Sequence, residues 1–174
     1  MCATTSVRPA IGTDRLILRG PVMADAPAIA ELANDLSVAG MVARMPYPYR
    51  LADAEAFLGR EPAPGSVEFA VEHRQFGLIG MLGFDVRKGR PQVGYWLGRP
   101  FWGRGYATEA LTAALRWARA DWRRNVVWAG HFADNKASGQ VLVKAGFLYT
   151  GVVEPRHCLA RGEAVATRMM VWLA

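Results

Sequence analysis

The chain has 174 residues, 52% of them hydrophobic, with a formal net charge of +6. This length suits one domain with a real core, and no apolar run approaches the ~20 residues that span a bilayer. The charge fits an anionic small ligand, an acidic macromolecule or merely a basic solvated surface, and without a dense Lys/Arg run or a known nucleic-acid motif we do not expect nucleic acid as the primary partner.

The two ends of the chain carry little structural information. Residues 1–12 contain no apolar segment typical of a secretion signal and are expected to form a flexible N-terminal arm, followed by a single domain over residues 13–174. One cysteine, Cys2, lies in the arm and the other, Cys158, near the C-terminus. A disulfide framework is therefore not expected, and a reducing cytoplasm fits this cysteine usage.

The first third of the chain predicts a strand and two helices. Residues 16–18 form a short apolar run, and Asp25 with Pro27 marks a helix start. Residues 45–49 contain two prolines and must form a loop. A second short helix is expected over residues 52–58. The apolar positions of the first helix are Ile29, Leu32, Ala33 and Leu36.

The rest of the chain alternates strand and helix patterns. Residues 67–71, 78–86 and 92–97 predict an antiparallel meander. A buried helix, a strand over residues 126–131, a helix over residues 136–144 that ends at Gly146, and a closing hairpin of residues 147–153 and 167–173 follow. The order indicates a mixed α+β sheet with helices packed against it. The buried helix shows its spacing at Ala107, Leu111, Leu115, Ala118 and Trp122.

A glycine turn precedes the buried helix and reads Trp102-Gly103-Arg104-Gly105-Tyr106-Ala107. The N-terminus of a helix presents unpaired amides and a positive dipole end, which together bind phosphate. Small residues at alternate positions clear the approach to these amides, and Arg104 adds positive charge. The alternative is an ordinary strand-to-helix turn that uses glycine for its backbone angles. No Gly-Lys-Ser/Thr follows, which excludes a P-loop, and a third glycine of the dinucleotide pattern would fall at Thr108.

The segment from Gly94-Tyr95-Trp96-Leu97 through this turn to Leu111 resembles the acetyl-CoA motif of the GNAT superfamily of N-acetyltransferases, and most closely the Rim-type branch that contains ribosomal-protein N-terminal acetyltransferases. The family motif reads Gln/Arg-x-x-Gly-x-Gly/Ala, and Trp102, Gly105 and Ala107 occupy its named positions, with Trp102 departing from Gln/Arg. Three other segments agree in order: residues 13–19, 134–138 and 142–147. The resemblance implies a mostly antiparallel sheet of about six to seven strands with about four helices.

The resemblance also implies which residues bind the donor, acetyl-CoA. The backbone of Tyr95, Trp96 and Leu97 would pair with pantetheine, and the Leu97 N–H would serve as an oxyanion donor. Asn135 would hydrogen-bond pantetheine, although a helix cap is an equally good reading, and Ser138 would lie near the sulfur. The pyrophosphate would be held at the turn, by Trp102, Gly103, Arg104, Gly105, Tyr106, Ala107 and Thr108.

The acid and the base are less clear, because the usual family residues are missing. The helix tyrosine that serves as acid in many relatives is Leu142 here, and the common glutamate base is Gln92. We therefore take Ser138 as the candidate acid and His131 as a titratable candidate base, with a strand-end packing role as the alternative for His131. Residues 45–49 would overhang the acceptor by analogy, while the histidines and cysteines show no metal-ligand spacing. Weaker candidates for the base, expected at the surface, are Glu68, His73 and Asp85.

These patterns predict a cytoplasmic acetyl-CoA-dependent N-acetyltransferase that acts on a primary amine, either a protein N-terminus or a small molecule, by direct attack. The missing tyrosine and glutamate leave open a non-catalytic acyl-CoA-binding or sensing module on the same fold. The positive charge also leaves open an interaction module tied to ribosomes. No membrane partner is expected, a homodimer is compatible with the sequence, and the identity of the acceptor is not encoded in any motif.

Overall fold

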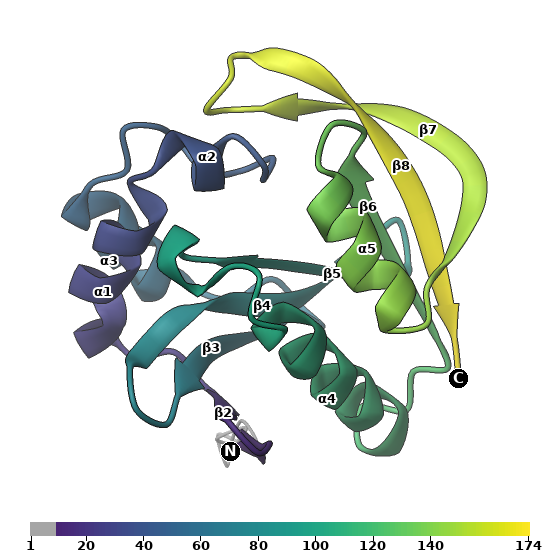
Figure 1. Ribbon diagram of the computed structural model, residues 1–174, viewed down its shortest axis with the longest axis horizontal. Helices are drawn as coiled ribbons and strands as arrows, with labels where there is room; N and C mark the ends of the chain where they lie inside the picture. Colours follow the sequence, from purple (N-terminus) through teal and green to yellow (C-terminus); the bar gives the residue numbers. More distant parts are fainter. Residues whose placement is uncertain (1–9) are drawn as a thin grey trace, which may run out of the picture.

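A single sheet with the strand order β1-β2-β3-β4-β5-β6-β8-β7 organises the computed structural model, which describes residues 10–174 (Figure 1). Neighbouring strands are antiparallel except for β5 and β6, which are parallel. The strands are β1 (Ile11–Gly12), β2 (Leu16–Arg19), β3 (Val67–His73), β4 (Gly77–Arg87), β5 (Arg90–Leu97), β6 (Val126–Phe132), β7 (Leu148–Cys158) and β8 (Glu163–Leu173). The helices are α1 (Ala26–Ala33), α2 (Leu36–Ala39), α3 (Leu51–Gly59), α4 (Tyr106–Ala120) and α5 (Lys136–Lys144), with short 3-10 helices at Met23–Asp25 and Arg99–Phe101.

The predicted fold class, a mixed and mostly antiparallel α+β sheet, is confirmed. The sheet has 8 strands rather than the expected six to seven, and the described chain has five α-helices rather than about four. The extra strand, β1, lies in the expected N-terminal arm: Ile11 and Gly12 pair with β2 and belong to the sheet. Residues 1–9 of that arm, which include Cys2, lie outside the described residues.

The expected first helix is split in two, which accounts for the extra helix. Asn34 leaves the helical conformation, and Asp35 caps a new helix by accepting a hydrogen bond from the Ser37 amide at 2.8 Å. Asp25 does precede α1, but its carboxylate pairs with Arg19 at 2.8 Å instead of capping the helix. Local propensity placed this segment correctly, and the Asp35 cap starts a second helix within it.

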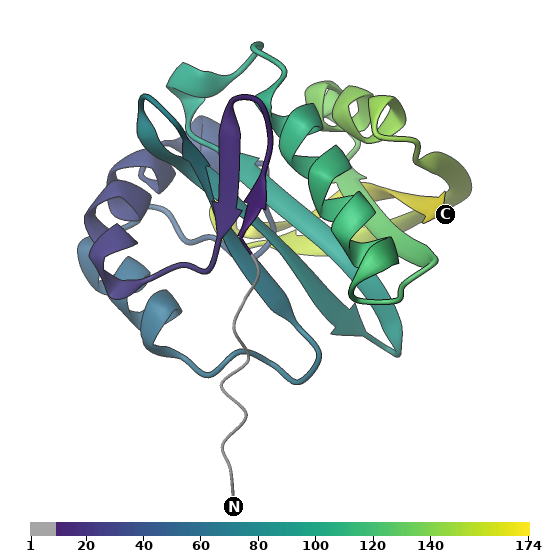
Figure 2. The same cartoon turned by 90° about the horizontal axis from the view of Figure 1, so that it is seen from below.

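The helices cover both faces of the sheet (Figure 2). Helices α4 and α5 pack on one face, where the larger core contains Leu111, Leu115 and Leu142. Helices α1 and α3 pack on the other face, over a second core that contains Ile29 and Met81. The apolar spacing of α4 is confirmed, since the residues that it buries recur every three or four positions.

The hairpin of β7 and β8 arches across the second face toward α2 (Figure 1). At its tip, the Leu159 amide donates to the Ala43 carbonyl at 3.0 Å. Arg161 donates to the Gly40 carbonyl at 2.6 Å and pairs with Asp134, the residue before the α5 cap, at 2.7 Å. These bonds tie the hairpin to the segment after α2 and to the start of α5. Among the described residues, no helix has the length and apolar character needed to cross a membrane.

Candidate active site

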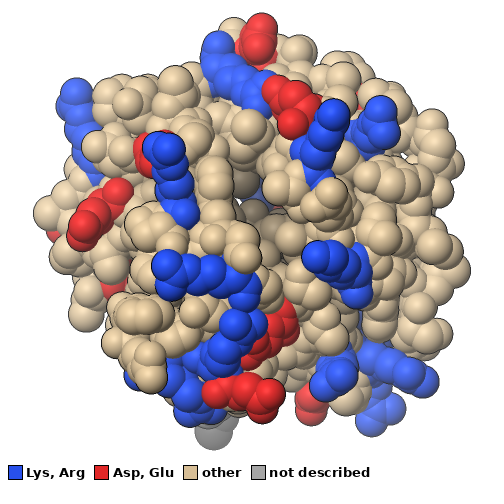
Figure 3. All heavy atoms as spheres, in the orientation of Figure 1, with Lys and Arg blue, Asp and Glu red and all other residues tan. Residues whose placement is uncertain are grey.

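The site begins where β5 separates from β6. These parallel strands share a single register pair, Gln92 with Trp128, although β5 continues to Leu97 and β6 to Phe132. Beyond Gln92 the strands splay apart and form a V. Figure 3 shows the surface hollowed near the centre of this view, in the region of α2, the end of β5 and α5.

The register of β4 and β5 determines which backbone groups face the V. The Gly98 amide donates to the Ile79 carbonyl at 2.9 Å. The next pair along the ladder, Gly80 with Leu97, is therefore a non-hydrogen-bonded pair, in which the backbone groups of the two residues point away from each other. Because such pairs alternate along an antiparallel ladder, Tyr95 opposite Leu82 is of the same type. The N–H and C=O groups of Tyr95 and Leu97 therefore point away from β4 and toward the gap.

The carbonyl of Leu97 has a partner at this point. The Trp102 indole nitrogen donates to it at 2.8 Å, which fixes the turn against the end of β5. The Leu97 amide is left facing the gap. Trp96 differs from its neighbours, since its backbone groups pair with Met81 on β4 and its side chain packs against the second core.

The predicted glycine turn lies directly beside this V. Gly103 and Gly105 have φ of 72° and 79°, values that favour glycine. A Cβ at Gly103 would meet nothing within 4 Å, so the approach to the backbone is open. Within residues 10–174, the amides of residues 103–108 donate to no protein acceptor. The turn thus presents a row of unpaired donors at the N-terminus of α4, as an anion site requires.

The side chains around the turn hold it in place and leave its amides open. Tyr106 is buried against His73 and beneath the Arg15 guanidinium, so only its backbone can face a ligand. Arg15 also donates to the Arg104 carbonyl at 3.0 Å and pairs with Glu109 at 2.6 Å. Burial disfavours the charged Glu109 carboxylate, but its hydrogen bonds from Thr13 and Arg15 outweigh this and hold its pKa below the usual value.

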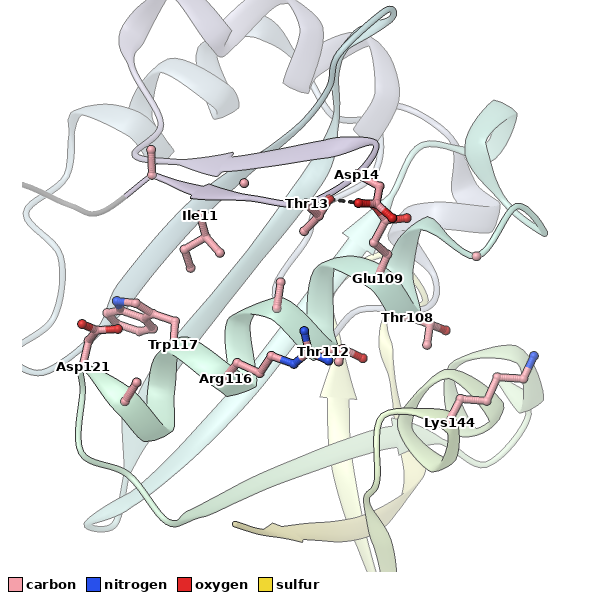
Figure 4. Close-up of a pocket in the computed structure, with 15 residues that line it drawn as sticks. Ile11, Thr13, Asp14, Thr108, Glu109, Thr112, Arg116, Trp117, Asp121 and Lys144 are labelled. Atoms are coloured by element: carbon pink, nitrogen blue, oxygen red, sulfur yellow. Dashed lines mark hydrogen bonds between the residues drawn. The ribbon is translucent and has the colours of Figure 1, made fainter.

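A shallow hollow of about 1070 Å³ adjoins the turn on the outer side of α4 (Figure 4). Gly105 and Thr108 form the part of it nearest the turn, and two cations, Arg116 on α4 and Lys144 on α5, also line it. The hollow lies beside the helix rather than at the end of β5. It can therefore receive a part of a ligand that is remote from the V.

Helix α5 places two of the predicted residues at the other side of the V. The Tyr95 hydroxyl lies 2.9 Å from the Ser138 hydroxyl and 3.2 Å from the Ser138 carbonyl, which ties β5 to α5. Burial raises the pKa of Tyr95 to about 12, against the opposing effect of the Ser138 hydrogen bond, so the phenol stays protonated. Asn135 caps α5 through its oxygen, at 3.1 Å from the Ser138 amide. Its NH₂ group has no partner within residues 10–174, so a cap and a ligand contact are compatible.

His131 is buried under α5 with both ring nitrogens occupied. Nδ1 lies 2.8 Å from the Phe132 carbonyl oxygen and Nε2 lies 3.1 Å from the Tyr149 hydroxyl. A carbonyl oxygen only accepts, so in the neutral ring Nδ1 carries the proton and Nε2 accepts from Tyr149. A Cβ at Gly139 would lie 2.9 Å from Nε2, which shows how closely α5 covers the ring. This geometry favours the packing role, and the base role of His131 stays a prediction.

The weaker candidates lie at separate places. Glu68 pairs with Arg60 at the surface. The expected surface position is wrong for His73, which is buried and stacked on Phe76, beside Tyr106. Asp85 lies opposite Gln92 in the β4–β5 register and therefore shares its face of the sheet. Of these three, only Asp85 is close to the V.

The face of β5 that carries Gln92, Gly94 and Trp96 is the floor of the space beneath the hairpin. Gly94 is exposed, lies opposite Gly83, and a Cβ there would meet nothing within 4 Å. Two glycines side by side leave this floor clear for a small group. In the loop expected to overhang it, Tyr49 is buried in the second core and Tyr47 remains 45% exposed.

Arg156 contacts the Gln92 side chain at the edge of the V, and no pattern in the sequence predicts this contact. No motif contains Arg156, and only the register of β7 against β8 and β6 brings it here. Within residues 10–174, no group of three His, Cys, Asp or Glu side chains is arranged to hold a metal.

Comparison with known proteins gives a family match over most of the chain. Residues 15–148 match the family model described as an acetyltransferase (GNAT) domain. A protein of Bacillus subtilis (strain 168) named as the uncharacterized N-acetyltransferase YoaA is 28% identical over 152 residues, which cover 83% of this chain and 86% of that protein.

Solved structures share the fold at low sequence identity. The Microcin C7 self immunity acetyltransferase MccE, in complex with acetyl-CoA and AMP, superposes with a TM-score of 0.81 at 19% identity and covers 93% of this chain and 94% of its own. The ribosomal L7/L12 alpha-N-protein acetyltransferase RimL, in complex with coenzyme A, gives a TM-score of 0.79 at 18% identity, with coverage of 95% and 98%. Rim-type enzymes are thus among the structural neighbours, as the sequence motif indicates.

Proposed function

The chain belongs to the GNAT acetyltransferase family, and from this premise we propose that it transfers the acetyl group of acetyl-CoA to a primary amine by direct attack of the amine on the thioester. The observation that carries the proposal is the pair of backbone faces on Tyr95 and Leu97, which point into the V with their hydrogen-bonding groups toward β6. An extended pantetheine arm can pair with such an edge as a missing strand would.

The residues of the turn fit the phosphates of the donor. A pyrophosphate placed over Gly103 would approach unpaired amides without meeting a side chain. We assign the hollow with Arg116 and Lys144 to the adenosine end, because these cations suit an anionic nucleotide and the hollow adjoins the turn. The whole ligand would then run from the outer side of α4, around its N-terminus, into the V.

The chemistry requires a stabilised oxyanion and the management of two protons. The Leu97 amide is placed to donate to the thioester oxygen as negative charge develops there. The Ser138 hydroxyl is the proposed donor to the leaving thiolate, and the protonated Tyr95 phenol positions it at 2.9 Å. An α-amine, with a reference pKa of ~8, can lose its proton to water, whereas a lysine side chain at ~10.4 needs more help.

Turnover assays test the proposal. The protein is incubated with acetyl-CoA and a panel of amines, including peptides with free N-termini, polyamines and amino acids, and free thiol is measured. We expect amine-dependent thiol release for at least one class. His131→Ala is assayed over the same pH range, since an unchanged pH–rate profile removes His131 as the base.

The second candidate function is a non-catalytic acyl-CoA sensor on the same fold. It is favoured by Leu142 at the usual tyrosine position and by Gln92, an amide that contacts Arg156 and cannot accept a proton usefully. Tight acetyl-CoA binding with no thiol release for any amine would support the sensor. The cytoplasmic location and the homodimer stay predictions, for which fractionation and light scattering are the measurements.

A further inference from the structure

Arg156 belongs to β7 of the hairpin, its side chain reaches Gln92 on β5, and no carboxylate closely neutralises its charge. Its side chain is 19% exposed, and the nearest carboxylate oxygen of the described residues, on Glu154, is 3.8 Å from Nη2. Nη2 also lies 3.5 Å from the Met169 sulfur. Arginine stays protonated in proteins, so this half-buried group is a standing positive charge.

Gln92 holds the guanidinium without cancelling its charge. In the amide orientation that satisfies both the oxygen and the nitrogen of Gln92, the oxygen accepts from both terminal nitrogens of Arg156, at 3.2 and 2.6 Å. A glutamate has the same shape but would form an ion pair in that position. The neutral amide therefore fixes the direction of Arg156 and leaves its charge available to another group.

The neighbouring charges leave this face positive. Asp85, opposite Gln92, is shared between Arg44 at 3.2 Å and Arg87 at 3.4 Å. Burial and then the positive charge of Arg87 lower the pKa of Arg156, while Glu154 acts in the opposite direction. Three guanidinium groups thus face two carboxylates, and the most buried of the three cations, Arg156, has the weakest partner.

We propose that Arg156, positioned by Gln92, binds an anionic group, a carboxylate or a phosphate, on the amine that accepts the acetyl group. This rests on the proposed function, since it names the acceptor class of that same site. Gln92 and Gly94 lie two residues apart on the same face of β5, and a Cβ at Gly94 would meet nothing within 4 Å. An acceptor lying over Gly94 would therefore have the bound thioester on one side and the Arg156 guanidinium on the other.

The strand geometry sets the size of this acceptor. At about 3.3 Å per residue, Gln92 lies roughly 10–17 Å along β5 from Tyr95 and Leu97. The long side chain of Arg156 spans part of this distance. The amine and its anionic group are therefore separated by several bonds, as in ω-amino acids, phosphorylated amines and peptides with an acidic residue near the N-terminus.

The test compares amines matched in size but not in charge. Initial rates are measured with an ω-amino acid, its neutral amide and a phosphorylated amine of similar length, at saturating acetyl-CoA. For the wild-type protein we expect kcat/KM about 10- to 100-fold higher for the anionic amines, the range that charge-assisted hydrogen bonds supply. The preferred group, carboxylate or phosphate, identifies the source of the anion.

Variants distinguish recognition from folding. Arg156→Gln should remove the preference for anionic amines by raising the KM for these amines, while the rate with the neutral amide is retained. Gln92→Met, which removes the amide oxygen that accepts from Arg156, should weaken the same preference. Arg168→Gln is the matched control, because Arg168 lies on the adjacent strand β8, is exposed and projects to the opposite face of the sheet. Thermal unfolding of each variant shows whether it is folded.

The outcomes separate this inference from the proposed function. No thiol release with any amine contradicts the proposed function. Release that is equal for neutral and anionic amines, or a preference that survives in Arg156→Gln, overturns the anion site and leaves the acetyltransferase intact. As a readout besides turnover, calorimetry with the ω-amino acid and coenzyme A should show binding to the wild-type protein and a loss of binding in Arg156→Gln.

Discussion

Replacing Gly94 by valine should block the acceptor without harming the fold. The Cβ would meet nothing within 4 Å, and Gly94 has no positive φ, so the substitution introduces no clash and no backbone strain. Valine is favoured in strands, and glycine inside a strand costs about 0.5–1 kcal/mol. The free energy of unfolding should therefore stay the same or rise slightly, while about three carbon atoms fill the floor between Gln92 and Trp96.

The kinetic effect should be large because amine attack needs close alignment. A displacement of about 1 Å costs on the order of 100-fold in rate, which equals about 2.7 kcal/mol in the barrier. We expect kcat/KM for the amine to fall about 100-fold in Gly94→Val and less in Gly94→Ala. Thiol release at varied amine gives kcat/KM, calorimetry gives the acetyl-CoA affinity, and thermal unfolding gives stability. If the folded valine variant acetylates every amine at the wild-type rate, the acceptor does not lie over Gly94 and the reasoning is refuted.

Three further predictions concern the donor site and its supports. Gly105→Glu should abolish acetyl-CoA binding, because it places a carboxylate at the turn. Gly105→Ala should retain some affinity, since it adds only the backbone strain of about 1–2 kcal/mol that a φ of 79° imposes on alanine. If calorimetry gives Gly105→Glu the same acetyl-CoA affinity as the wild-type protein, the turn is not the phosphate site. Ser138→Ala should lower kcat about 10- to 100-fold with acetyl-CoA binding retained, and a wild-type pH–rate profile would exclude this hydroxyl as the acid. Glu109→Gln should lower the free energy of unfolding by about 1 kcal/mol at pH 7. Folding lowers the pKa of the Glu109 carboxyl, so this group stabilises the protein at pH values above its unfolded pKa and loses the effect as the pH falls through its folded pKa. Urea unfolding should therefore show the two proteins converging in acid, and a constant difference down to pH 2 would contradict the assignment.

Much of the fold could be predicted because its signals are local. The apolar spacing of α4, the glycine turn before it and the helix at Lys136–Lys144 each depend on residues close together in the chain, and the structure has them as expected. The boundaries differ where bonds outside the local pattern decide them. Asp35 caps a separate helix α2, and β1 forms only because β2 is there to pair with Ile11 and Gly12. Helix α1 starts after Asp25 as predicted, although the Asp25 carboxylate pairs with Arg19 instead of capping the helix.

The candidate site divides in the same way. The turn proposed to hold the phosphates is one continuous segment, so its residue types and spacing suggested a phosphate site, and its resemblance to the family motif indicated the donor. The direction of the Leu97 amide follows from its pairing with Gly80, and the V follows from a single register pair between β5 and β6.

The sequence by itself therefore indicated the fold class through local helix and strand patterns, and it indicated the family and the donor through the resemblance of several ordered segments, because each of these signals lies within a short stretch of chain. Tertiary structure alone decided the surroundings of the acceptor. Arg156 stands 64 positions from Gln92 and meets it only through the order of β5, β6, β8 and β7. The same packing placed His131 beneath α5 and between two hydrogen-bond partners, which no reading of neighbouring residues could foresee.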